Sequence, residues 1–169
     1  MVAGMRLLLF LLIFAFLIGC APPVDETGPR KITYWEKWSG FEGEACGKMV
    51  ESFNAKEQAR AKTEPGYRPI EVTRVSVSKI EQKLLVAIAG GNPPDVAGLY
   101  SWIVTAYADK GALTDLTDEL AEAGISRDDY TPVFWNMCEH RNRMWGIPTT
   151  PATTALHWNK RLFREVGLD

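Results

Sequence analysis

The stretch KITYWEKWSGFEGEACGKMVESFNAKE, residues 31–57, places a short strand directly before a helix. Residues 31–35 are predicted to form the strand, and the turn at residues 39–40 begins a helix that extends to about residue 57. One face of this helix is expected to be apolar, because apolar side chains recur there at helical spacing. The members of that face are Ala45, Met49, Val50 and Phe53. The stretch therefore predicts the first strand–helix unit of an α/β fold.

A second strand and a second helix follow the first pair. Residues 70–77 are rich in β-branched side chains and predict the strand. Residues 78–81 match a capping box, in which the Ser78 hydroxyl and the Glu81 carboxylate satisfy free backbone N–H groups. The helix is expected to end at the glycine pair 90–91. Its buried side chains are expected to be Ile80, Leu84, Leu85 and Ile88.

The same alternation continues once more along the chain. Residues 95–99 predict a third strand and residues 102–110 a third helix, which Gly111 would end. Strands and helices at this spacing form βαβ crossovers and a parallel sheet. Ligands of such sheets bind outside the carboxyl ends of the strands. The two segments expected there are residues 36–40 and 99–102, and both contain tryptophan.

The remainder of the chain contains shorter predicted elements. Helices are expected at residues 117–123, 129–138 and 160–166, and extended segments at 144–148 and 153–158. These elements would complete one α/β lobe and continue beyond it.

The first twenty residues have the pattern of an export signal rather than of a folded element. Arg6 precedes an apolar run, residues 7–18, which is shorter than the roughly 20 residues that span a bilayer. The run leads into the residues LIGC at 17–20, which resemble the lipobox of bacterial lipoproteins and imply a diacylglycerol on Cys20. The alternative is an ordinary secreted protein with a chance cysteine. Residues 21–30, with three prolines, predict an extended tether.

Composition excludes several classes of protein. The chain has 169 residues and a formal net charge of −2, which argues against a nucleic-acid binder. It has no glycine-rich nucleotide-binding motif and no zinc-ligand spacing, so neither a cofactor nor a metal is expected. Carboxylates are present for a glycosidase, but the sequence favours no particular pair. Whether Cys46 and Cys138 form a disulfide is left open.

Aromatic residues at the predicted strand ends indicate a sugar-binding surface, because sugars present C–H faces to flat rings and hydroxyls to polar groups. Trp38 and Trp102 are the candidate platforms, although each could instead fill an apolar gap in the lobe. Tyr100 and Ser101 lie on the same loop and can hydrogen-bond to hydroxyls; the alternative for Ser101 is helix capping. The remaining tryptophans are expected to pack inside the fold: Trp35, Trp135, Trp145 and Trp158.

Five segments in order resemble the carbohydrate-type solute-binding proteins of ABC importers. They are residues 32–45, 89–96, 107–113, 145–150 and 156–163. The resemblance implies an α/β, type II periplasmic-binding-protein-like fold, with two lobes and the ligand in the cleft between them. Because members of this family are much longer, the chain is expected to be a fragment.

The resemblance also implies domain limits and further site residues. The N-terminal lobe would comprise residues 31–149, and residues 150–169 would form the hinge crossover and the start of the second lobe. Glu36 and Ser39 would face the cleft, with Glu36 accepting hydrogen bonds from adjacent hydroxyls unless it is an exposed loop acid. Thr150 would be a contact in the hinge. The candidate ligand-binding residues are therefore Glu36, Trp38, Ser39, Tyr100, Ser101, Trp102 and Thr150.

The expected function is that of a monomeric, extracytoplasmic binding lipoprotein without catalytic residues. It would be anchored to the membrane through Cys20 and would deliver a sugar or sugar derivative to the permease subunits of an ABC importer. The alternatives are a binding protein of the same fold for another polar solute, such as a polyol phosphate, and an extracytoplasmic carbohydrate-active enzyme. A structural surface lipoprotein that binds no solute is a further alternative.

Overall fold

The computed structural model describes residues 28–150, 152 and 155–168. The predicted signal peptide, Cys20 and most of the predicted tether lie outside the described residues. Among the residues that are described, no helix is both long enough and apolar enough to cross a bilayer.

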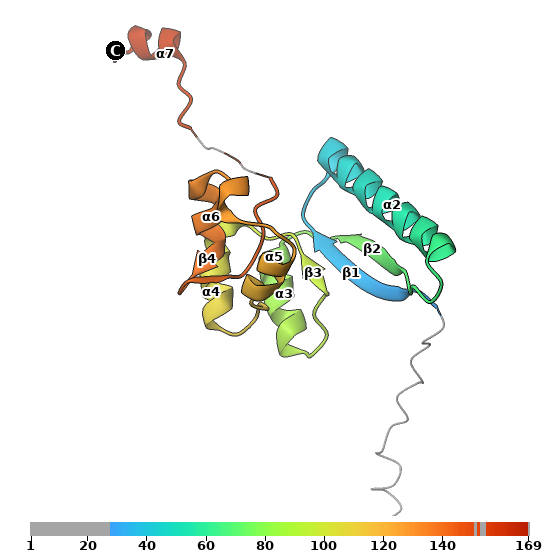
Figure 1. The fold of residues 1–169 in the computed structure, drawn as a ribbon. Coiled ribbons are helices and arrows are strands. Elements are labelled where there is room, and N and C mark those ends of the chain that lie inside the picture. Colours follow the sequence, from blue (N-terminus) through green and yellow to red (C-terminus); the bar gives the residue numbers. More distant parts are fainter. Residues whose placement is uncertain (1–27, 151, 153–154, 169) are drawn as a thin grey trace, which may run out of the picture.

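A three-stranded parallel sheet lies at the centre of the first part of the lobe (Figure 1). Its strands are β1 (Arg30–Glu36), β2 (Ile70–Ser76) and β3 (Val96–Ala97), in the order β2-β1-β3. β1 pairs with β2 along its whole length and with β3 only near its carboxyl end. The predicted parallel sheet is confirmed, although β3 is shorter than the predicted segment 95–99.

Helix α2 (Gly40–Thr63) covers one side of β1 and β2 and is longer than predicted (Figure 1). The predicted apolar face is wrong. Met49 is 63% exposed and Phe53 40% exposed, whereas Gly43 and Cys46 are buried. Small residues face the strands because they let the helix backbone approach the sheet closely; a Cβ on Gly43 would lie 3.0 Å from the Trp38 carbonyl oxygen.

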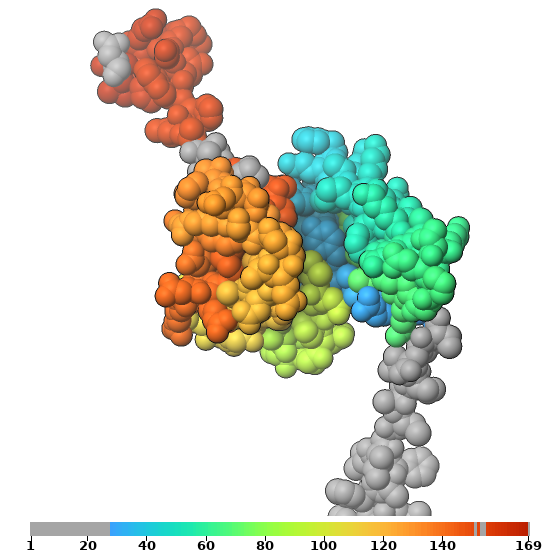
Figure 2. Space-filling view, viewed as in Figure 1, coloured from blue at the N-terminus to red at the C-terminus, as the bar shows by residue number. Residues whose placement is uncertain are grey.

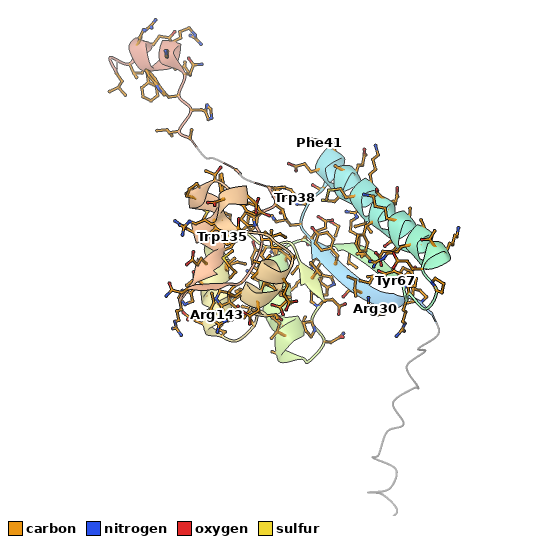
Figure 3. The ribbon with its side chains drawn as sticks, viewed as in Figure 1. Arg30, Trp38, Phe41, Tyr67, Trp135 and Arg143 are labelled. Atoms are coloured by element: carbon orange, nitrogen blue, oxygen red, sulfur yellow. The ribbon has the colours of Figure 1, made fainter. Side chains whose placement is uncertain are left out.

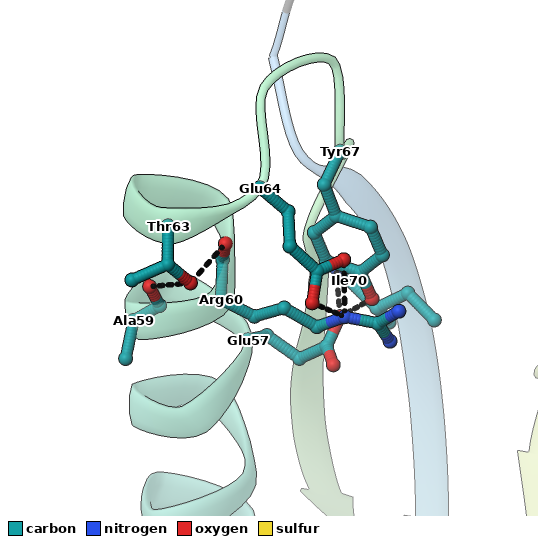
Figure 4. Close-up of polar contacts among 7 residues, drawn as sticks. All are labelled: Glu57, Ala59, Arg60, Thr63, Glu64, Tyr67 and Ile70. Atoms are coloured by element: carbon teal, nitrogen blue, oxygen red, sulfur yellow. Dashed lines mark hydrogen bonds and ion pairs between the residues drawn. The ribbon is translucent and has the colours of Figure 1, made fainter.

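Polar side chains hold the far end of α2 against the start of β2 (Figure 4). A Glu57 carboxylate oxygen accepts hydrogen bonds from the Tyr67 hydroxyl at 2.6 Å and the Ile70 amide at 2.9 Å. Arg60 pairs with Glu64 at 2.9 Å, and its guanidinium carbon lies 4.1 Å from the centre of the Tyr67 ring. This cluster lies at the amino edge of the sheet, opposite the predicted ligand site.

Helix α3 (Ile80–Ala89) begins differently from the prediction. Lys79 occupies its N-cap position with a left-handed backbone (φ 53°), and no side chain caps the helix, so the capping box at residues 78–81 is wrong. The local pattern is overridden by tertiary packing, because Ile80 in the first turn is only 1% exposed. The helix ends at Gly90 as predicted, with Gly91 at φ 70°.

The predicted helix at residues 102–110 is divided into two elements. They are the 3-10 turn η1 (Ser101–Ile103) and helix α4 (Val104–Asp109), and Gly111 follows at φ 64°. Tyr107 of α4 is buried and donates its hydroxyl proton to the Glu81 carbonyl, which joins α4 to α3.

A second group of elements packs beside the sheet and forms its own small core. The elements are α5 (Thr117–Glu122), η2 (Arg127–Asp129), α6 (Pro132–Cys138) and the hairpin of β4 (Glu139–His140) and β5 (Arg143–Met144). Their core comprises Leu120, Trp135, Cys138 and Met144. The packing predicted for Trp135 is therefore confirmed, whereas the hairpin was not predicted.

The remaining predictions concern single residues and the last helix. Cys46 and Cys138 are both buried free thiols, so the structure contains no disulfide between them. Helix α7 (Lys160–Glu165) is confirmed and is capped by the Asn159 side chain. Trp158 contacts Phe163 but is 44% exposed, contrary to the prediction that it packs inside the fold.

Candidate functional site

The candidate site lies where β1 and β3 end side by side. Trp35 of β1 is paired with Ala97 of β3, and the Gly98 amide donates to the Trp35 carbonyl at 2.7 Å. The loops that follow the two strands therefore leave the same edge of the parallel sheet. The molecular surface is hollowed between α2 and the α4–α6 side of the lobe, and blue atoms from the β1 region lie in the hollow (Figure 2).

Glu36, the last residue of β1, is fully buried (0% exposed) and holds this edge together. One carboxylate oxygen accepts a 2.5 Å hydrogen bond from Arg74 of β2, and the other accepts from the Trp38 amide. The alternative of an exposed loop acid is therefore wrong. Both oxygens are already paired within the lobe, so direct contact between Glu36 and a solute stays a prediction.

Trp38 is positioned by contacts to its backbone from two sides. Its carbonyl oxygen accepts a hydrogen bond from the Ser76 hydroxyl at 3.2 Å, and Gly43 of α2 approaches that same carbonyl. Its amide is fixed by Glu36. Trp38 lies at the junction between the first strand–helix unit and the rest of the lobe (Figure 3). The loop is thus held at both its amide and its carbonyl, with the ring partly exposed.

Three of the predicted residues are brought together in one row of aromatic rings. The Lys37 ammonium lies 4.3 Å from the centres of both the Trp38 and Tyr100 rings. Tyr100 is stacked on Trp102, with ring centres 4.3 Å apart and planes inclined by 11°. The row Trp38–Lys37–Tyr100–Trp102 joins the loops after β1 and β3. Trp102 is 72% exposed, which contradicts the alternative that it fills a gap in the lobe.

Lys37 was not predicted as a site residue. The only signal in the sequence was a cation next to a tryptophan in a strand-end loop, and the distant partner Tyr100 cannot be inferred from that. Burial lowers the pKa of Lys37, and the negative charges of Glu81 and Glu36 oppose this change. The ammonium group is therefore partly withdrawn from water between two rings.

The two serines differ in their surroundings. Ser39 is exposed at the N-cap position of α2, and its hydroxyl makes no capping hydrogen bond. Ser101 is the first residue of η1 rather than its cap, and its hydroxyl lies 3.3 Å from the sulfur of Met137. Ser39 thus presents a hydroxyl group to solvent at the site edge, whereas Ser101 is turned toward α6.

Thr150 is exposed, and no described contact joins it to the aromatic row. Its role at the hinge stays a prediction. Within the described part of the chain, no three His, Cys, Asp or Glu side chains are grouped as metal ligands would be.

Comparisons with known proteins identify the family. A sequence model of the family described as Bacterial extracellular solute-binding protein matches residues 47–169. The chain belongs to this family. It is 24% identical to the diacetylchitobiose binding protein DasA of Streptomyces coelicolor. That match extends over 144 residues and covers 85% of this chain and 31% of DasA. It is 25% identical over 162 residues to the sn-glycerol-3-phosphate-binding periplasmic protein UgpB of Escherichia coli, covering 92% of this chain and 35% of UgpB.

Solved structures support the same assignment. The structure of CpMnBP1 with mannotriose bound has a TM-score of 0.58 and 25% identity, covering 83% of this chain and 33% of that one. The structure of the sugar-binding protein MalE of Xanthomonas citri has a TM-score of 0.56 and 21% identity, and the match covers 70% of this chain and 28% of MalE. The fold is therefore the type II periplasmic-binding-protein-like fold, of which this chain forms a part. It spans about a third of the length of the relatives that it matches, and those relatives are binding proteins rather than enzymes.

Proposed function

We propose that this chain provides the N-terminal wall of a site that captures a sugar or sugar derivative for an ABC importer. The observation that carries the proposal is the aromatic row at the joint edge of β1 and β3, where Trp102 offers an exposed ring next to Tyr100. Flat rings bind the C–H faces of sugars, and neighbouring hydroxyls such as that of Ser39 supply polar contacts. A relative named for diacetylchitobiose and a similar structure with mannotriose bound support this ligand class.

The proposed mechanism is a change in population between open and closed lobes. We place the end of the first lobe at residue 149 and the crossover to the second lobe at residues 150–169, with Thr150 near the ligand. A solute that touches both lobes stabilises the closed form, and no covalent bond changes. The closed protein then delivers the solute to the permease. We further propose that the protein is a monomer held outside the cytoplasmic membrane through a lipid on Cys20.

The test is a fluorescence titration of the full-length protein against a panel of sugars and oligosaccharides. Saturable quenching of tryptophan, with the sugar recovered unchanged by chromatography, is the expected result. A smaller sugar in the recovered material would show an enzyme instead. No response to any member of the panel, in fluorescence or in thermal unfolding, would contradict solute capture.

A second candidate is a polyol phosphate, the class named for the relative UgpB. Including glycerol 3-phosphate in the same titration distinguishes it from the sugars. Saturable binding of glycerol 3-phosphate alone would keep the capture function and replace the ligand class.

A further inference from the structure

Lys37 is the centre of the aromatic row rather than an addition to it. Its ammonium nitrogen is equally distant, 4.3 Å, from the ring centres of Trp38 and Tyr100, which come from two different loops. A cation between two ring faces is attracted by both. The position is also the edge of the sheet where solutes of parallel α/β folds bind. Lys37 therefore brings a positive charge to the proposed site.

This charge has no carboxylate partner at close range. Among the ion pairs formed by the described residues, none includes Lys37. The neighbouring carboxylate of Glu36 is engaged by Arg74 and by the Trp38 amide. The carboxylates of Glu81, Glu36 and Glu42 act on Lys37 through their electrostatic fields, which oppose the lowering of its pKa by burial. The ammonium is partly desolvated by two rings and is not neutralised by contact with an acid.

We infer that Lys37 is a specificity-determining residue that recognises an anionic group, phosphate or carboxylate, on a solute bound at this edge of the sheet. The inference rests on the proposed function and narrows its ligand class. An anionic group supplies the missing counter-charge and accepts charge-assisted hydrogen bonds from the ammonium. A neutral sugar provides no such charge-assisted contact.

The experiment compares matched solutes that differ in one charged group. Binding of glucose, glucose 6-phosphate, glucuronate, glycerol and glycerol 3-phosphate to the full-length protein is measured by calorimetry. The anionic member of a pair is expected to bind about tenfold or more tightly, the size of a hydrogen bond to a charged group. Glucose 6-phosphate against glucuronate separates phosphate recognition from carboxylate recognition.

Variants then assign the preference to Lys37. Lys37→Met is expected to remove the preference, and Lys37→Arg to retain part of it. Lys62→Met removes a lysine charge from the last turn of α2, at the end of the helix opposite to the loop of Lys37, and is expected to leave the preference unchanged. A measurement on the unmodified protein avoids any effect on folding: added salt should weaken binding of the anionic members and leave the neutral members unaffected.

The outcomes separate this inference from the proposed function. Equal binding of neutral and anionic partners, or an equal loss of both in Lys37→Met, would overturn the role of Lys37 and leave sugar capture standing. Binding of none of these five solutes would overturn the role of Lys37, and only an additional lack of response to the oligosaccharide panel would overturn solute capture as well. A preference that follows Lys37 and is screened by salt supports the inference.

Discussion

At the scale of single residues, similar side chains have different roles because their surroundings differ. Trp135 is buried in the α5–α6 core, whereas Trp102 projects into solvent on the ring of Tyr100. The sequence could place Trp102 in a loop at the carboxyl edge of the sheet, since that position follows from the order of strands. It could not reveal the partners of Lys37 and Glu36, because Tyr100 and Arg74 come close only through the crossovers.

The two tryptophans give the first prediction. Trp102→Ala is expected to weaken solute binding by roughly tenfold, the scale of one lost aromatic contact, and to lower stability by no more than about 1.5 kcal/mol, the size of its stacking contact with Tyr100. Trp135→Ala is expected to lower the free energy of unfolding by about 3–5 kcal/mol, because it leaves a large cavity. Calorimetric binding and urea unfolding measure the two effects. A strong loss of stability in Trp102→Ala would contradict its placement as an exposed platform.

Glu36 gives the second prediction. Glu36→Ala is expected to destabilise the protein by about 3 kcal/mol, because Arg74 loses its buried partner and the Trp38 amide loses its acceptor. Glu51→Ala, at an exposed position on α2, serves as the control and is expected to change stability by less than about 0.5 kcal/mol. Urea unfolding of both variants is the measurement. Equal stability of the two would show that Glu36 does not hold the sheet edge.

At the scale of elements, the alternation of strands and helices is predictable and the packed faces are not. The glycine pair 90–91 indicates where α3 ends, since this signal acts within a few residues, whereas the predicted end of α2 at about residue 57 falls short of Thr63. The buried face of α2 depends instead on how closely its backbone approaches β1 and β2, so Gly43 and Cys46 face the sheet in place of the larger Met49. The capping box fails for the same reason, because the burial of Ile80 dictates the preceding turn.

The glycines of α2 give the third prediction. Gly43→Ala is expected to cost about 1–2 kcal/mol, because the new Cβ would lie 3.0 Å from the Trp38 carbonyl and force the helix or the loop to move. Gly47→Ala meets only Arg74, at 3.9 Å, and is expected to stabilise the protein by up to about 1 kcal/mol through helix propensity. Thermal unfolding compares them. A stability gain in both variants would contradict the close helix–loop contact.

At the scale of the whole molecule, the described lobe is tied together by carboxylates at several separate points. Glu57 accepts from Tyr67 and Ile70, and these hydrogen bonds lower its pKa. Asp95 accepts from the Thr33 amide at 2.7 Å and from the Thr33 hydroxyl at 3.0 Å, which lowers its pKa in the same way. A hydrogen bond from His140 lowers the pKa of Asp109 in the same way. Hydrogen bonds from Thr117 lower the pKa of Asp115. Each carboxylate joins segments of the lobe in its charged form.

These lowered pKa values predict the response of the lobe to acid. A carboxyl group whose pKa is lower in the folded state stabilises that state above its unfolded pKa, about 4, and the stabilisation is lost as the pH falls through the folded pKa. The melting temperature is therefore expected to be level between pH 5 and neutrality and to fall steeply below about pH 4. Glu57→Gln isolates one contribution. The melting temperature of this variant should lie below that of the unmodified protein at pH 7, and the difference should shrink at low pH as Glu57 of the unmodified protein becomes protonated. Melting curves recorded from pH 7 to pH 2.5 test this, and a deficit that is constant with pH would show that the Glu57 charge plays no part in joining α2 to β2.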